Sequence, residues 1–160
     1  MNNKLNNKRK MLRQIDELKQ NITNNTAQHI IQAVEEAMGI PYEVMCLKTR
    51  KREIVQARQM CWYYMWHYCQ PEMTLVQMGM QFSPATFDHS SCLHGRDTIA
   101  DLIHVDKRMR AFAADVDTRI QELERGDIYF DSSSSSGLNL AQYMEFDTVN
   151  VRQARLQMLV

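Results

Sequence analysis

Residues 74–95 read TLVQMGMQFSPATFDHSSCLHG, and their pattern is that of two helices joined by a turn. Thr74 and Gln77 have the spacing of a capping box, in which each residue satisfies a backbone amide of the other at the start of a helix. The proline-containing run 83–86 predicts a turn. A longer helix is expected over about 87–103. A short capped helix, a turn and a longer helix form the arrangement of a helix-turn-helix.

Apolar residues at helical spacing predict more helices on both sides of this motif. These helices cover residues 4–22, a segment that begins at Thr26, about 52–69, and about 106–125. Asn24 and Asn25 are expected to separate the first two, and Gly39 to end the second. Asp106 is the expected N-cap of the last. The side chains that we expect inside the 52–69 helix are Ile54, Ala57, Cys61, Tyr64 or Met65, and Tyr68. The sequence therefore predicts an all-α bundle of five or six helices.

The chain of 160 residues has room for one ordinary domain with flanking segments. We expect an amphipathic helix or tail over 1–26, the helix-turn-helix domain over 27–126, and a Ser-rich linker and C-terminal tail over 127–160, which includes five consecutive serines. No window of 18 apolar residues exists, and the N-terminus lacks the apolar core of a secretory signal. A cytoplasmic location and no membrane contact are therefore expected.

Several chemical classes find no support in the sequence. The cysteines Cys46, Cys61, Cys69 and Cys92 form no CxxC pair and are expected to be free, buried thiols. None of the five glycines lies in a phosphate-binding loop, so no bound nucleotide is expected. His89 and Cys92 share a helix face, but His94 points elsewhere, which argues against a zinc site. Because no nucleophile–base pair or carboxylate dyad is evident, we expect neither an enzyme nor a cofactor.

The charge is unevenly distributed although the formal net charge is +0. Residues 1–60 hold 11 Lys or Arg against 6 Asp or Glu, and residues 61–160 hold 8 against 13. Four cations fall within 48–52, at the entrance of the 52–69 helix. Lys48, Lys51 and Arg52 are suited to neutralise phosphates while an arginine enters a minor groove. The first half of the chain therefore carries a candidate basic patch for nucleic acid.

The second helix of a helix-turn-helix enters the major groove with its N-terminus first, so its first turn meets the base edges. Here that turn contains Asp88, His89, Ser90 and Ser91. A carboxylate accepts a hydrogen bond from cytosine N4, and imidazole or hydroxyl groups donate or accept at several base edges. Ser91 and the helix N-terminus are also suited to hold a phosphate. The residue types therefore indicate binding of double-stranded DNA.

These residues resemble a known family. The run DHSSCLHG over 88–95 looks like the D-H-T-T-V-L-H-A signature of the C-terminal DNA-binding domain of the bacterial replication initiator DnaA. TRKREIVQARQM over 49–60 is similar to that family's basic loop and long helix, and TLVQMG over 74–79 through Phe82 resembles its S-L-x-E-I-G-x-x-F helix. The resemblance covers about 27–124. It implies an all-α helix-turn-helix bundle of the tryptophan-repressor-like or DnaA C-terminal type, without the family's ATPase module.

The resemblance also implies roles for single residues. Arg50 matches the minor-groove arginine, and Asp88, His89 and Ser90 match the positions that read the major groove of a nine-base-pair box. Ser91 and His94 match phosphate-side positions of the recognition helix, and further backbone-contact positions are matched by Arg58, Gln59 and Thr74. The implied partner is double-stranded DNA in replication initiation or its regulation, at the nucleoid, and a second replication or regulatory protein is a further candidate partner.

The sequence departs from the family at several positions, and two other functions stay open. Phe87 stands where the family has an arginine, Trp66 replaces a residue that is often basic, and the segments 70–73 and 83–86 are longer. One alternative is a tryptophan-repressor-like transcriptional regulator, which would bind a two-fold-symmetric site as a dimer. The other is a protein-interaction module that has kept the fold and lost DNA binding.

Overall fold

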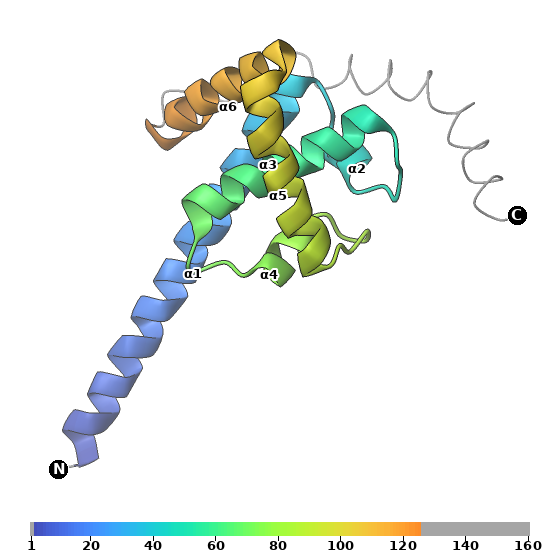
Figure 1. The fold of residues 1–160 in the computed structure, drawn as a ribbon. Helices are drawn as coiled ribbons and strands as arrows, with labels where there is room; N and C mark the ends of the chain where they lie inside the picture. The colour runs from blue at the N-terminus through green and yellow to red at the C-terminus, as the bar shows by residue number, and fades with distance from the viewer. Residues whose placement is uncertain (1, 126–160) are drawn as a thin grey trace, which may run out of the picture.

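The computed structural model describes residues 2–125, which form helices joined by short loops, without a strand in this range (Figure 1). The all-α prediction is confirmed. The helices are α1 (Asn2–Met38), α2 (Tyr42–Met45), α3 (Arg52–Cys69), α4 (Leu75–Met80), α5 (His89–Val105) and α6 (Lys107–Arg125). None of them is both long enough and apolar enough to cross a membrane. The linker and tail predicted for 127–160 lie outside the described residues, and the predicted domain boundaries stay predictions.

The central helix of the bundle is α3, which packs against α1, α2, α4 and α5. Its buried side chains surround most of the helix, as expected for an element covered on several sides; they are Ile54, Ala57, Arg58, Met60, Cys61, Trp62, Tyr64, Met65 and Cys69. The prediction that Tyr68 faces inward is wrong, because its side chain is 43% exposed. Cys69 takes the inward position at the end of α3, and the ring of Tyr68 stacks on Tyr64.

The predicted break at Asn24 and Asn25 is wrong, because α1 continues through both residues. Thr26 caps no new helix; its hydroxyl donates to the Ile22 carbonyl oxygen inside α1 at 3.1 Å. The second half of α1 packs against α3 and α6 and buries Ala27 and other small or branched side chains. This burial outweighs the low helix propensity of asparagine. The helix ends as predicted at Gly39, which has a positive φ of 68°.

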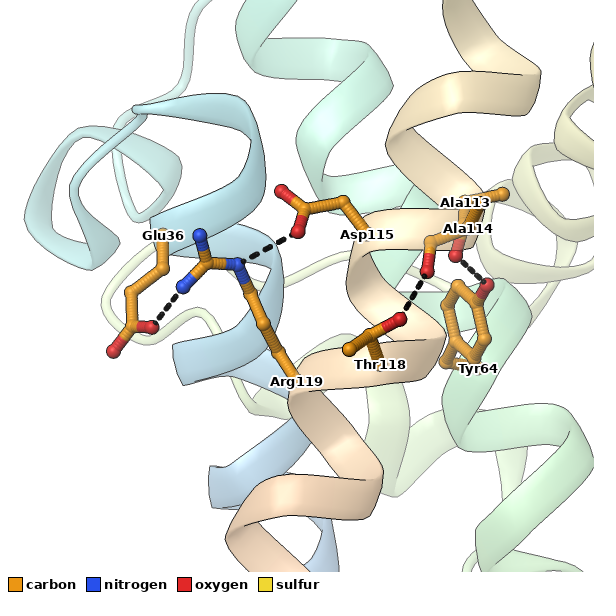
Figure 2. Close-up of polar contacts among 7 residues, drawn as sticks. All are labelled: Glu36, Tyr64, Ala113, Ala114, Asp115, Thr118 and Arg119. Carbon is orange, nitrogen blue, oxygen red and sulfur yellow. Dashed lines mark hydrogen bonds and ion pairs between the residues drawn. The ribbon is translucent and has the colours of Figure 1, made fainter. Parts of the chain in front are cut away.

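Two polar contacts join α6 to its neighbours (Figure 2), one to α1 and one to α3. Arg119 forms ion pairs with Glu36 of α1 at 2.6 Å and with Asp115 at 3.2 Å. The Tyr64 hydroxyl of α3 donates to the Ala113 carbonyl oxygen of α6 at 2.8 Å. The ion pairs are partly exposed and contribute little to stability, whereas the tyrosine contact is buried. α6 is therefore held mainly by its apolar face and by the Tyr64 hydroxyl.

Replacing Tyr64 with phenylalanine is expected to lower the free energy of unfolding by about 1 kcal/mol, because the buried Ala113 carbonyl loses a donor while the ring stays packed. Urea denaturation followed by circular dichroism measures the change. Tyr63→Phe is the matched control, since Tyr63 is only half-buried, and it should change stability by less than about 0.5 kcal/mol. Equal losses for the two variants would contradict the assignment.

Candidate nucleic-acid interface

α4 and α5 form the helix-turn-helix, and both begin with a side-chain cap. The Thr74 hydroxyl accepts from the Gln77 amide at 3.3 Å, and the Gln77 side chain accepts from the Thr74 amide at 2.8 Å. The predicted capping box is therefore confirmed. α5 begins two residues later than expected, at His89, because Asp88 is its N-cap and accepts from the Ser91 amide at 2.7 Å. Asp106 caps α6 in the same way, as predicted.

Two glycines allow the helices of this motif to approach closely. A Cβ atom on Gly79 would lie 2.0 Å from the Phe87 carbonyl oxygen, and the Phe87 amide donates to the Gly79 carbonyl oxygen at 3.4 Å. On α5, a Cβ atom on Gly95 would lie 2.8 Å from the Trp62 ring and 2.9 Å from Cγ of Gln59. The segment before α5 thus lies directly on α4, and α5 lies directly on α3.

The first turn of α5 is open to solvent. We call residues 88–91 the α5 tip; Asp88, His89, Ser90 and Ser91 are all exposed, and so is His94 one turn later. Hydrogen bonds from Ser91 hold the pKa of the Asp88 carboxyl below its usual value. Asp88 is therefore ionised at neutral pH and both caps the helix and faces solvent. The tip presents an acceptor, an imidazole and two hydroxyls to any partner.

Residues 46–52, which we call the basic loop, connect α2 to α3 and include the first residue of α3. Lys48, Arg50, Lys51 and Arg52 are exposed. The loop has its own hydrogen bonds, because the Thr49 amide donates to the Leu47 carbonyl oxygen at 2.9 Å and the Thr49 hydroxyl accepts from the Lys51 amide at 3.3 Å. The four cations therefore project from a loop whose backbone is partly fixed.

Arg58, predicted as a contact to the DNA backbone, lies inside the domain, and that predicted contact stays a prediction. Its side chain is buried, with 3% exposed. The guanidinium donates to the carbonyl oxygens of Leu47 at 2.7 Å, Thr49 at 2.7 Å and Met45 at 3.3 Å. It also lies 4.5 Å from the centre of the Phe87 ring. Burial lowers its pKa, but three carbonyl acceptors and an aromatic face accommodate its charge.

The contacts of Arg58 join the two predicted DNA-contacting segments. Its hydrogen bonds hold the carbonyls of the basic loop, and its cation–π contact holds Phe87, the residue directly before the α5 tip. In Figure 1 the loop between α2 and α3 and the loop between α4 and α5 emerge on the same side of the bundle. The basic loop and the α5 tip are therefore neighbours, as the sequence predicted.

The remaining predicted contact positions lie at different depths. Gln59 is half-buried with its stem against Gly95, and Thr74 is exposed at the start of α4. Their predicted contacts with a DNA backbone stay predictions. The aromatic residue Trp66 is half-buried and its ring lies under Arg96 of α5.

Sequence reasoning missed Arg96. Its guanidinium lies 4.3 Å from the centre of the Trp66 ring and forms an ion pair with Asp97 at 2.6 Å. Arg96 therefore supplies from α5 a cation next to the α3 position that Trp66 occupies. Its place two turns after His89 puts both on one face of α5. The only signal in the sequence was that spacing, because the contact between α3 and α5 is a tertiary one.

The cysteines are buried and free, as predicted. Burial raises the pKa of the thiol of Cys69 to about 11 and that of Cys92 to about 12, so both are protonated at neutral pH. Within residues 2–125, no three His, Cys, Asp or Glu side chains are grouped as metal ligands. The chemistry that the basic loop and the α5 tip offer is therefore that of cations, hydroxyls and an imidazole beside the exposed carboxylate of Asp88.

Comparison with known proteins gives one consistent result. Residues 27–99 match the family model of the bacterial dnaA protein helix-turn-helix. The chain is 30% identical over 92 residues to the chromosomal replication initiator protein DnaA of Flavobacterium psychrophilum. The aligned segment covers 58% of this chain and 18% of that protein. It is 32% identical over 98 residues to the chromosomal replication initiator protein DnaA of Chloroflexus aurantiacus. That aligned segment covers 61% of this chain and 20% of the relative. The chain thus spans about a fifth of the length of these relatives. No solved structure gives a significant match.

Proposed function

We propose that this chain binds double-stranded DNA with sequence preference, on the ground that residues 27–99 match the family model of the bacterial dnaA protein helix-turn-helix. The basic loop and the α5 tip make the contacts. The observation that carries the proposal is the position of Arg58, which contacts the basic loop and Phe87 at once. Two segments that are far apart in sequence can therefore meet adjacent grooves of one duplex.

In this proposal the α5 tip enters the major groove and the basic loop follows the neighbouring backbone. The imidazole of His89 and the hydroxyl of Ser90 meet base edges, and the Asp88 carboxylate accepts from cytosine N4. Arg50 enters the minor groove, where the potential is most negative. Lys48, Lys51 and Arg52 neutralise phosphates. Ser91 and Thr74 are placed at helix N-termini, where phosphate oxygens are bound favourably, and the imidazole of His94, one turn further along α5, contacts a phosphate.

Replication initiation or its regulation is the process that we propose for this binding, on the ground that the similar curated proteins are chromosomal replication initiators. The proposal places the protein at the nucleoid and assigns it no reaction and no bound nucleotide. A second replication or regulatory protein is a proposed additional partner. The preferred DNA sequence distinguishes replication from transcription, because a two-fold-symmetric sequence would favour the transcriptional-repressor alternative.

The direct test is selection of bound duplexes from a random pool at two salt concentrations. We expect a single enriched sequence of roughly one helical turn. Neutralisation of about five phosphates should make log K fall with log salt at a slope of about −4 to −5. Absence of any duplex binding at low salt would refute the proposal and favour the protein-interaction alternative.

Replacing His89 with alanine is expected to weaken binding to the selected duplex by about 1–3 kcal/mol and to leave binding to random DNA nearly unchanged, because the imidazole reads base edges. Arg50→Ala is expected to cause a loss of similar size on the selected duplex. Electrophoretic or fluorescence titrations measure both. His104→Ala is the matched control, since His104 is exposed at the other end of α5. Equal losses on selected and random duplexes for His89→Ala would exclude base reading.

A further inference from the structure

The first half of α1 extends away from the bundle (Figure 1). Half of the large hydrophobic side chains that are exposed in the described residues belong to this half; they are Leu5, Met11, Leu12, Ile15, Leu18 and Ile22, with exposed fractions of 41–65%. The same stretch is rich in asparagine, which has a low helix propensity. A helix of this composition needs packing against a partner to be stable in water.

Four of these residues form a continuous line, which we call the α1 stripe: Met11, Ile15, Leu18 and Ile22. At 100° per residue, the α1 stripe lies roughly 120° around the helix from the buried residues Ala27, Ile30 and Val34. The α1 stripe is thus centred on a different side of the helix from the face that packs against α3 and α6, and the buried Ala33 lies at the edge between the two. On its side of the helix the following turns carry polar residues such as Asn25 and His29.

We propose that the α1 stripe is a self-association surface that pairs with the α1 stripe of a second, antiparallel copy of this chain. The spacings along it are 4, 3 and 4 residues, an order that is the same in both directions. An antiparallel copy therefore places Ile15 opposite the second Leu18 and Met11 opposite the second Ile22. These are the alternating a–d layers that a two-helix seam requires.

The charges along α1 select the antiparallel arrangement. Residues 4–13 carry Lys4, Lys8, Arg9, Lys10 and Arg13 and no carboxylate. A parallel copy would place these five cations against an identical set, which is repulsive. In the antiparallel register, residues 4–13 of one copy lie along residues 20–29 of the other, which contain neither Lys nor Arg. The exposed aliphatic stem of Lys19 then covers Leu12 of the other copy.

Cysteine substitution tests the register on the full chain. Chains with Met11→Cys are mixed with chains with Ile22→Cys and treated with a short bismaleimide. In the antiparallel pair, residue 11 of one copy lies beside residue 22 of the other, whereas the two residues 11 are about 16 Å apart along the axis. We expect cross-linked dimers from the mixture and not from either variant alone. The unsubstituted chain is the control for reagent access, since its four cysteines are buried.

Sedimentation velocity over a range of concentrations tests the surface itself. We expect a concentration-dependent dimer, and we expect Ile15→Lys or Leu18→Lys to weaken self-association by at least about tenfold. Val105→Lys is the matched control, because Val105 is an exposed apolar residue (79%) outside α1. A chain that stays monomeric throughout, a dimer unaffected by the substitutions in the α1 stripe, or cross-linking of Met11→Cys to itself would overturn the proposal.

Discussion

Replacement of Arg58 with methionine is expected to lower the free energy of unfolding by about 2–4 kcal/mol and to reduce the preference for the selected duplex at least about tenfold. The carbonyl oxygens of Leu47 and Thr49 lose charged donors, and the Phe87 ring loses its cation. The basic loop and the α5 tip are then no longer held at one separation. Base contacts and minor-groove contacts need that separation to form together.

The salt dependence distinguishes this positioning role from a phosphate contact. If Arg58 only positions the basic loop and the α5 tip, the slope of log K against log salt should stay unchanged in Arg58→Met. Arg58→Lys should also lose its preference for the selected duplex, because an ammonium cannot donate in the fixed fork geometry of a guanidinium. If Arg58 instead contacts a phosphate, the slope should fall by about one and lysine should restore binding. Arg108→Met is the matched control, since Arg108 also lies over a phenylalanine, 5.3 Å from the Phe112 ring, but is exposed.

Replacement of Gly79 with alanine is expected to destabilise the protein by about 2–4 kcal/mol. The added Cβ would lie 2.0 Å from the Phe87 carbonyl oxygen, so the backbone before α5 would have to move. The sign of the change in stability distinguishes a steric clash from helix propensity, because alanine in an unobstructed helix stabilises that helix by about 1 kcal/mol relative to glycine. Thermal and urea denaturation measure the change.

A control in the same helix separates the steric effect from helix propensity. Met80 is 56% exposed, and Met80→Ala should change stability by less than about 0.5 kcal/mol. If Gly79→Ala were neutral or stabilising, α4 and the segment before α5 would not be in the close contact described above. Since that contact also sets where Asp88 begins α5, Gly79→Ala should weaken binding to the selected duplex as well.

Local patterns in the sequence were sufficient for the helix-turn-helix. The capping box of Thr74 and Gln77 and the cap at Asp88 depend on residues three positions apart, and the structure contains both. The exposed α5 tip and the basic loop follow from the polarity of consecutive residues. Such features form from interactions within one or two turns, so a sequence pattern is enough to identify them.

Tertiary packing decided the features that the sequence predicted wrongly or did not indicate. α1 continues through Asn24 because its second half is buried against α3 and α6, and Arg58 turns inward because Phe87, two carbonyls of the basic loop and the carbonyl of Met45 in α2 surround it. The sequence by itself determined the caps at Thr74 and Asp106 and which cations exist. The direction in which Arg58 points and the face of α1 that remains open were decided by tertiary contacts, because the free energy of burying a side chain depends on which surfaces the fold brings against it.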